Sequence, residues 1–201
     1  MTETYLPAMG HDRLLPLYDP FTRLLGVRHL HQRLVDQADV RTGMRLLDIG
    51  CGTGNLTILA AEQHPSTAVT GLDPDPRGLA WGRRKAQRAG LSIRFDRGFA
   101  GDLPYATGSY DRVFSALMLH HVSDPAAAVR EAARVLAPGG CIHIVDITGH
   151  GKGRRGQRHG GGTHHGTDLL ALLAAADLTD AREVGHGSNR FGPYRYYRAT
   201  R

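Results

Sequence analysis

Short, largely apolar runs recur along the middle of the chain. They cover residues 45–49, 68–73, 91–96, 111–117 and 141–147. An uninterrupted apolar run of about 4–8 residues is typical of a strand buried on both faces of a parallel sheet. Segments with apolar residues three and four positions apart separate these runs. The alternation predicts an α/β domain around a parallel sheet.

The separating segments predict helices, because their apolar residues recur with helical spacing. The helices cover residues 21–37, 54–63, 76–89, 125–136 and 167–176, with Thr167 as the N-cap of the last one. Two strands, 181–184 and 191–199, follow and are joined by a short link, 185–189. Consecutive strands joined by a short link are antiparallel. The sheet is therefore expected to be mostly parallel and to end in an antiparallel hairpin.

An acid and three alternating glycines stand where the first strand meets the first helix. Asp48 is followed by Gly50, Gly52 and Gly54. Glycines there allow positive φ angles and the close approach of a ligand. The next helix would point its free N–H groups at the same place. The turn therefore predicts a ligand site, and the alternative is a tight turn that binds nothing.

This stretch resembles the first motif of the class I S-adenosylmethionine-dependent methyltransferases, which reads acid-x-Gly-x-Gly-x-Gly. A dinucleotide fingerprint would instead read Gly-x-Gly-x-x-Gly. The resemblance extends over about residues 44–148 and is strongest to the type 11 and ubiquinone-menaquinone methyltransferase-like members. It implies a Rossmann-like, doubly wound, seven-stranded sheet with one antiparallel strand. It also implies S-adenosylmethionine as the cofactor and S-adenosylhomocysteine as its product.

The resemblance places the methionyl end of the cofactor at Asp48, Gly50, Cys51, Gly52 and Gly54. That end carries an ammonium and a sulfonium, and the cofactor has no pyrophosphate. An acid beside the glycine turn suits such a cation better than it suits a dinucleotide phosphate.

Asp73 closes the second strand, 19 residues after Gly54. A carboxylate at this strand end can accept hydrogen bonds from both ribose hydroxyls. The resemblance gives Asp73 the same role and places Pro74 beside the cofactor. The alternative is that Asp73 is the N-cap of the following helix.

Adenine recognition departs from the family pattern. Residues 98–105 resemble the family stretch Gly-Asp-Ala-x-x-Leu-Pro-Phe, and Phe99 occupies the position of its acid. Asp102 is displaced by three residues, so the role is not transferred to it. Phe99 is expected to stack on the adenine ring, and the Ala100 backbone N–H to serve a ring nitrogen; the alternative for Phe99 is core packing.

The fourth strand continues into a segment that resembles the family's Leu-His-His end. Ser115 and Ala116 are expected to flank the methionyl part of the cofactor. His120 and His121 follow at the carboxyl edge, where open α/β folds bind ligands. Either could take a proton from a methyl acceptor, with His120 also contacting it. The alternative is that both histidines only hold the loop.

The sequence predicts one methyltransferase domain over residues 1–201. Its expected parts are an N-terminal helical cap (1–40), the cofactor-binding core (41–148), a flexible Gly/Arg/His loop (149–166) and a C-terminal helix and hairpin (167–201). Within the cap, the resemblance implies that Tyr18 helps to cover the pocket and binds substrate. The alternative is a helix packed on the sheet edge.

The composition indicates where in the cell the protein is expected, but it does not identify a binding partner. The 201 residues are 41% hydrophobic, and no run reaches the ~18–20 apolar residues of a membrane span. No secretory signal precedes residue 10, and the two cysteines, Cys51 and Cys141, do not make a disulfide framework. We therefore expect a cytoplasmic protein with no membrane partner.

The net charge of +6 is largely local. Residues 149–166 hold four Lys or Arg, four His and no acid. His159, His164 and His165 could bind a metal, but no Cys, Asp or Glu nearby completes a ligand set, so no metal site is predicted.

The expected reaction is in-line transfer of a methyl group to a small-molecule O, N or C acceptor. The chain lacks an Asn/Asp-Pro-Pro-Tyr signature for base amines and a Pro-Cys nucleophile for pyrimidines. One alternative is a cofactor-binding accessory or regulatory protein without turnover. A less favoured one is an RNA methyltransferase guided by the 149–166 loop; nucleic acid is otherwise not expected, and a homodimer is left open.

Overall fold

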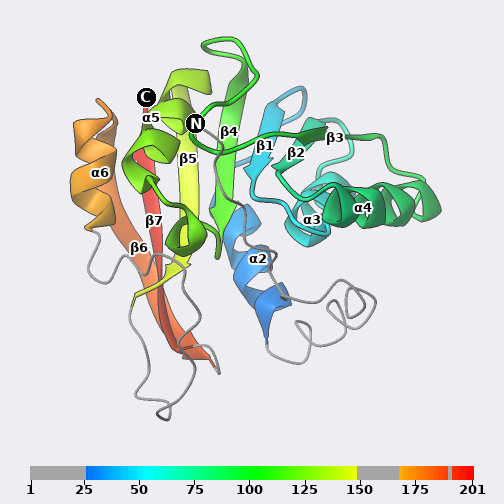
Figure 1. Ribbon diagram of the computed structural model, residues 1–201, viewed down its shortest axis with the longest axis horizontal. Helices are drawn as coiled ribbons and strands as arrows, with labels where there is room; N and C mark the ends of the chain where they lie inside the picture. The colour runs from blue at the N-terminus through cyan, green and yellow to red at the C-terminus, as the bar shows by residue number, and fades with distance from the viewer. Residues whose placement is uncertain (1–25, 149–167, 190–191) are drawn as a thin grey trace.

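A computed structural model describes residues 26–148, 168–189 and 192–201, and Figure 1 shows the arrangement of their elements. Seven strands form one sheet in the order β3-β2-β1-β4-β5-β7-β6. The strands are β1 (Arg45–Ile49), β2 (Ala68–Asp73), β3 (Ile93–Arg97), β4 (Tyr110–Ala116), β5 (Leu136–Ile147), β6 (Thr179–Asn189) and β7 (Gly192–Thr200). The first five are parallel, and β7 runs antiparallel to both β5 and β6. The predicted doubly wound sheet with its C-terminal hairpin is confirmed.

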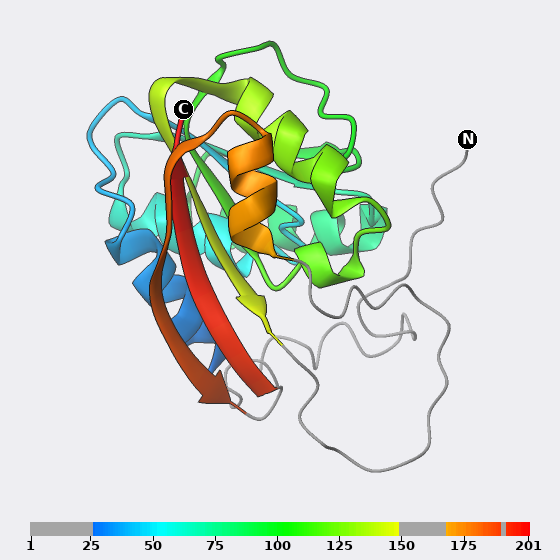
Figure 2. The same cartoon turned by 90° about the vertical axis from the view of Figure 1, so that its left-hand side faces the viewer.

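Helices cover both faces of this sheet. They are α2 (Val27–Asp36), α3 (Asn55–Gln63), α4 (Pro76–Arg88), α5 (Pro125–Val135) and α6 (Leu169–Ala175), with a 3-10 turn, η2 (Leu119–His121). The edge-on view of Figure 2 shows α5 and α6 on one side of the β5–β7 region and α2 on the other.

Successive side chains of each central strand point to opposite faces of the sheet and pack into two separate apolar cores. Leu47 and Val113 belong to the apolar cluster that includes α5 and α6. Their strand neighbours, Leu46 and Phe114, belong to the cluster that includes α2 and α3. Because both faces are buried, the central strands carry apolar residues on both faces, as the sequence pattern indicated.

Strand order reverses between β1 and β4, because the chain runs outward from β1 to β3 and then returns to pair β4 with β1. Crevices at such a reversal, outside the carboxyl ends of the strands, are where open α/β sheets bind ligands. The fold therefore brings the ends of β1, β2, β4 and β5 to a single edge.

Several local predictions were wrong. Residues 185–189 are part of β6 and not a link, since Asn189 pairs with Gly192 in β7. Strand β5 begins at Leu136, five residues before the expected 141. The N-cap of α6 is Asp168, whose carboxylate accepts the N–H groups of Leu170 and Ala171; the proposed cap, Thr167, lies outside the described residues.

Among the described residues, the longest helix has 13 residues, and none has the length and apolar character needed to cross a bilayer.

Candidate cofactor site and acceptor edge

The glycine turn has the positive φ angles that its sequence predicts. Gly50, Gly52 and Gly54 all take positive φ angles, 74°, 53° and 77°. The N–H groups of Gly50 and Cys51 donate to the Leu72 carbonyl at 2.8 and 3.0 Å, which ties the turn to the end of β2. A side chain at Gly50 would overlap Met118, which follows β4. The turn is thus held between β2 and the segment after β4.

Helix α3 begins directly at this turn. Its N-cap, Gly54, supplies no side-chain hydrogen bond to the first N–H groups of the helix. Uncapped N–H groups and the helix dipole present partial positive charge at the turn. They can therefore bind a carboxylate such as the one at the methionyl end of the expected cofactor.

Asp48 is a buried acid beneath the turn. Only 3% of it is exposed, and its Oδ2 accepts a hydrogen bond of 2.6 Å from the Thr57 hydroxyl of α3. Burial raises the pKa of Asp48 to about 7, against the opposing effect of the Thr57 hydrogen bond. A nearby cation would favour the ionised form, so the site suits a ligand carrying an ammonium or sulfonium.

Asp73, at the end of β2, is aimed by two backbone donors. Its Oδ2 accepts the N–H of Gly52 and its Oδ1 the N–H of Asp75, both at 2.8 Å. The N-cap of α4 is Asp75, which accepts the N–H of Arg77, so the alternative that Asp73 caps this helix is wrong. Each carboxylate oxygen has two lone pairs, which leaves acceptor capacity for two vicinal hydroxyls.

The expected adenine side follows β3. The Gly98 N–H donates to the Asp73 carbonyl at 3.3 Å, which brings this loop to the end of β2. Phe99 is half-buried, and a bridge pairs it with Asp102. The pKa of Arg134 on α5 is raised mainly by Glu131, and the charge of Asp102 also contributes. Asp102 therefore lies close enough to α5 to interact with it electrostatically.

Neighbouring residues complete this edge of the sheet. The Pro74 carbonyl accepts a hydrogen bond of 3.2 Å from Nε of Arg97, and Ala100 packs against the larger apolar cluster. Ser115 pairs with Ile49 across β1 and β4 and is 3% exposed. Its hydroxyl has no hydrogen-bond partner among the described residues. A buried hydroxyl without a partner calls for a ligand or a water, and this one lies beside the end of β1.

His120 is paired with an acid that sequence reasoning missed. Its Nδ1 lies 2.5 Å from Oδ1 of Asp146, near the end of β5, and its backbone N–H lies 3.2 Å from Oδ2. His121 stacks against it, with 3.9 Å between ring centroids. The signal for Asp146 was available: it is an acid at the carboxyl end of a buried strand, as Asp48 and Asp73 are.

Other predicted residues fall into three groups. Burial raises the pKa of the Cys51 thiol, which favours a thiol within the turn over a nucleophilic thiolate. Ala116 is half-buried at the end of β4. Tyr18 and the 149–166 loop lie outside the described residues, as do His159, His164 and His165. In the part of the chain that the structure describes, no three His, Cys, Asp or Glu residues gather as a metal site.

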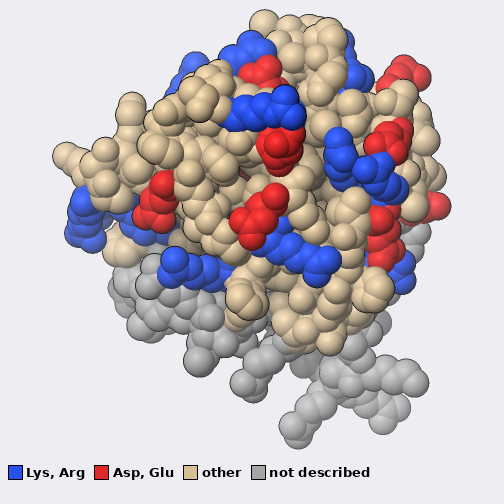
Figure 3. Space-filling view, turned by 180° about the vertical axis from the view of Figure 1, so that it is seen from behind, with Lys and Arg blue, Asp and Glu red and all other residues tan. Residues whose placement is uncertain are grey.

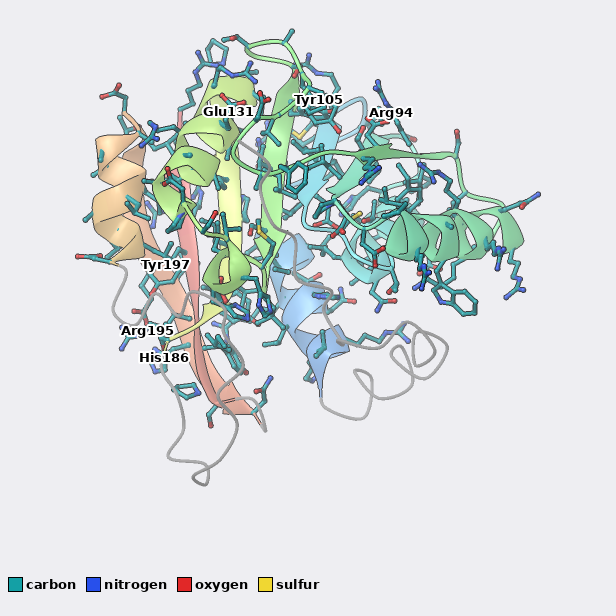
Figure 4. The ribbon with its side chains drawn as sticks, in the orientation of Figure 1. Arg94, Tyr105, Glu131, His186, Arg195 and Tyr197 are labelled. Carbon is teal, nitrogen blue, oxygen red and sulfur yellow. The ribbon has the colours of Figure 1, made fainter. Side chains whose placement is uncertain are left out.

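Polar clusters away from this edge have structural partners. In Figure 4, Arg94, Tyr105 and Glu131 lie at the amino-terminal edge of the sheet. Tyr105 donates to Asp96 at 3.1 Å, and Glu131 accepts the Leu103 N–H at 2.8 Å, so both brace the loop before β4. His186 and Arg195 are labelled on the β6–β7 hairpin.

A doubly wound sheet with an acidic glycine turn and a strand-end carboxylate defines a nucleoside-binding α/β protein, and comparisons identify the family. The model of a methyltransferase domain matches residues 46–140. The demethylmenaquinone methyltransferase of Thermus thermophilus is 36% identical over 148 residues, covering 72% of this chain and 67% of the relative. This chain therefore belongs to the class I S-adenosylmethionine-dependent methyltransferases of the ubiquinone/menaquinone type.

Other relatives differ in length and substrate. The 27-O-demethylrifamycin SV methyltransferase of Amycolatopsis mediterranei is 37% identical over 120 residues, 59% of this chain and 44% of the relative. This chain spans 57% of the demethylmenaquinone methyltransferase of Deinococcus radiodurans. It thus covers about half to two thirds of these relatives.

Solved structures confirm the fold. The YcgJ protein from Bacillus subtilis has a TM-score of 0.70 at 19% identity, covering 86% of this chain and 98% of that one. The phosphoethanolamine N-methyltransferase 2 of Haemonchus contortus has a TM-score of 0.71 at 15% identity, and the match covers 86% of this chain and 52% of that one.

Proposed function

We propose that this chain transfers the methyl group of S-adenosylmethionine to an O, N or C atom of a small molecule. The observation that carries this proposal is the link between the glycine turn and Asp73. The Gly52 N–H orients the ribose carboxylate directly, so the turn and the acid form one cradle. Asp48, buried under the same turn, supplies the negative field that a cationic donor requires.

The proposed contacts follow the order of elements along the edge. Asp48, Gly50, Cys51, Gly52 and Gly54 would hold the methionyl end, with Ser115 and Ala116 flanking it. Asp73 and Pro74 would hold the ribose, and Phe99 and Ala100 the adenine. The bound cofactor supplies an activated methyl group on a sulfonium, whose departure leaves a neutral thioether.

What the chain itself contributes is alignment. Fixed groups that hold an acceptor in line with a methyl group at ~3 Å replace several kcal/mol of entropic barrier. His120 and His121 lie on the acceptor side in this proposal, and Tyr18 would cover it. Cys51 takes no covalent role, because its raised pKa keeps it a thiol.

A small molecule is the favoured acceptor class. The printed names of two relatives specify demethylmenaquinone and 27-O-demethylrifamycin SV. On the face shown in Figure 3, basic and acidic side chains are interspersed and form no continuous basic surface, which gives no support to an RNA substrate. Cys51 and Cys141 are free thiols, which supports a reducing, cytoplasmic location within the same proposal.

Calorimetry with S-adenosylhomocysteine tests the cradle. The Asp73→Asn variant should bind at least about 10-fold more weakly, because a hydrogen bond to a charged group contributes about 1.5–3 kcal/mol. Asp75→Asn is the matched control: it removes a charge two residues away, and asparagine caps helices as well as aspartate does. Its affinity should stay within about twofold of wild type. Equal losses in both variants would contradict the ribose assignment.

A methyl-release assay with a metabolite panel separates enzyme from accessory protein. Turnover of the cofactor to S-adenosylhomocysteine with at least one small molecule is the expected result. Tight binding of the cofactor with no turnover across the panel would favour the accessory or regulatory alternative.

A further inference from the structure

The second cysteine of the chain lies away from the edge of the sheet that carries the proposed cofactor site. Cys141 is five residues before Asp146 in β5, which is about 17 Å along an extended strand. It pairs with Arg112 of β4 on one side and with Thr200 of β7 on the other. The proposed methyl transfer gives this thiol no role.

Two polar side chains of β7 contact the thiol. Nη2 of Arg198 lies 3.5 Å from Sγ of Cys141, and Oγ1 of Thr200 lies 3.4 Å from the same sulfur. Burial by itself raises the pKa of Cys141, but the hydrogen bonds of Thr200 and Arg198 oppose it, and the pKa is lowered overall. Such surroundings favour the thiolate, which is the nucleophilic form of cysteine.

A second guanidinium adds positive charge at the same place. Arg112 is buried, and its guanidinium donates to two backbone carbonyls that follow α2, at 2.6 and 3.2 Å. Its charge is a further cause of the lowered pKa of Cys141. The pKa of Arg198 is raised first by its hydrogen bond with the thiol, and also by the charges of Asp180 and Asp39. Both arginines therefore stay charged beside the sulfur.

A buried histidine on the same face of β5 has polar atoms without partners. His143 stands two positions after Cys141 and pairs with Arg198 across β5 and β7. It is 1% exposed, and among the described residues neither its ring nitrogens nor Nε of Arg198 has a hydrogen-bond partner. Burial, and then the charges of Arg112 and Arg198, lower the pKa of His143 to about 3, so the ring is neutral at pH 7. Buried polar atoms of this kind indicate a place for a small polar molecule.

The position of the sulfur limits the size of a reagent. Cys141 is 4% exposed, whereas Pro138 and Gly139, just before it in the chain, are exposed. The thiolate therefore lies just beneath the surface, where a reagent close to water in size fits better than a protein or a peptide disulfide. Hydrogen peroxide has this size, and its oxygens donate and accept hydrogen bonds.

We propose that Cys141 is a modification site, a thiolate that small peroxides oxidise to a sulfenic acid, and that Arg198 activates it. The sulfur attacks one peroxide oxygen, so that a sulfur–oxygen bond forms while the oxygen–oxygen bond breaks. Sulfur is oxidised, and the second oxygen is reduced and leaves as hydroxide, which takes a proton from the solvent. Nε of Arg198 and the ring of His143 offer hydrogen bonds to the oxygen that sulfur gains.

Oxidation measured at each cysteine tests this proposal and needs no cofactor. The protein is treated with hydrogen peroxide at pH 7, quenched with catalase and unfolded in urea that contains dimedone, and mass spectrometry of its peptides locates the trapped sulfenic acid. Cys141 should be oxidised at least about 10-fold faster than Cys51. Cys51 is the internal control, because it is 8% exposed against 4% for Cys141, so accessibility alone would give the opposite order.

Two substitutions test the arginine. Arg198→Met should slow the oxidation of Cys141 at least about fivefold, whereas Arg198→Lys, the matched control, keeps a cation and should stay within about threefold of wild type. Looser packing of β7 would expose the sulfur and speed its oxidation, so a slower rate reports the lost charge. Thermal unfolding midpoints show whether both variants fold. An unchanged rate in a folded R198M would contradict the role of Arg198.

The pH profile of the wild-type reaction makes the test independent of any variant. The thiolate fraction rises as pH passes through the pKa, so a lowered pKa moves the midpoint of the oxidation rate to lower pH. The midpoint for Cys141 in the folded protein should lie below that for the same cysteine in the urea-unfolded chain. A midpoint at or above that value, or oxidation of Cys141 no faster than that of Cys51, would overturn the proposal. Neither result bears on cofactor binding, so the proposed function is tested separately.

Discussion

At the scale of single residues, burial of the Asp48 carboxylate lowers the stability of the folded protein. Asp48 lies in a buried strand, where Thr57 donates a hydrogen bond to its carboxylate, and burial raises its pKa to about 7. An acid whose pKa is raised on folding binds more protons in the folded than in the unfolded state between about pH 4 and pH 7. Stability therefore falls as pH rises through that window. A residue that lowers folding stability in this way is typical of a binding site.

The Asp48→Asn variant should be more stable than wild type and should bind cofactor less well. Asparagine keeps an oxygen for Thr57 but removes the buried charge, for an expected gain of about 0.5–2 kcal/mol in the free energy of unfolding at pH 8. For this length that is about 1–8 °C in Tm. Urea unfolding at pH 5 and pH 8 measures it, and the advantage should be smaller at pH 5, where Asp48 is protonated in the folded state.

Calorimetry on the same variant completes this prediction. Affinity for S-adenosylmethionine should fall at least about 10-fold, because the cation loses its counter-charge. Equal stability and equal affinity to wild type would show that Asp48 is a neutral core residue.

At the scale of elements, glycines let α4 approach the glycine turn. A side chain at Gly82 would lie 2.9 Å from Cε1 of Phe95 and 3.3 Å from the Thr53 carbonyl oxygen. Phe95 itself comes within 2.9 Å of the position that a side chain at Gly54 would occupy. One aromatic ring thus sets the distance between β3, α4 and the start of α3.

Gly82→Ala should therefore destabilise the protein, although alanine is the better helix former. Overpacking a filled site costs about 1–3 kcal/mol, which exceeds the ~1 kcal/mol gained in helix propensity. Urea unfolding of G82A, F95L and the double variant measures the effect. The penalty for G82A should shrink in the F95L background, where the ring is absent. An unchanged penalty would place the strain elsewhere.

The sequence pattern predicted some elements to the residue. Strands β1 and β2 match because apolar runs closed by Asp48-Ile49 and Asp73 leave no other boundary. Strand β3 begins two residues later than expected, at Ile93. Leu91 is instead held by the end of α4, since its N–H donates to the Ala86 carbonyl at 2.9 Å. This bond belongs to a local Schellman motif, in which the helix ends at a glycine with positive φ, here Gly90, and the apolar pattern of the strand does not reveal it.

In the site, too, some residues could be predicted from local sequence, whereas one contact depends on how the strands pair. Local spacing indicated Asp48 and Asp73, because each acid closes a strand within the motif region. Asp146, in contrast, contacts His120, which lies 26 residues earlier in the chain. Only the pairing of β4 with β5 brings the two side chains together, so the sequence could offer the acid but not its contact.

At the scale of the whole molecule, we propose that the described elements are one folding unit. The sheet is continuous from β3 to β6, and α2 is joined to the C-terminal hairpin. Arg33 of α2 lies over the Tyr196 ring, 4.8 Å from its centroid, and its Nη2 lies 3.5 Å from the Val184 carbonyl oxygen. Elements far apart in sequence therefore share one core.

Unfolding should accordingly be a single transition. The chain has one tryptophan, Trp81 on α4, so its fluorescence reports on one end of the sheet. Circular dichroism reports on all elements, and the two urea curves should coincide. Curves with separate midpoints would show that α4 and the C-terminal hairpin belong to different units.

The most direct test of the central claim is a crystal structure with S-adenosylhomocysteine bound. We expect both ribose hydroxyls to donate to Asp73, the amino group to lie near Asp48, and the sulfur to lie between the glycine turn and His120. A ligand whose ribose lies away from Asp73, or that binds at another edge of the sheet, would contradict the cradle on which the proposed methyl transfer rests.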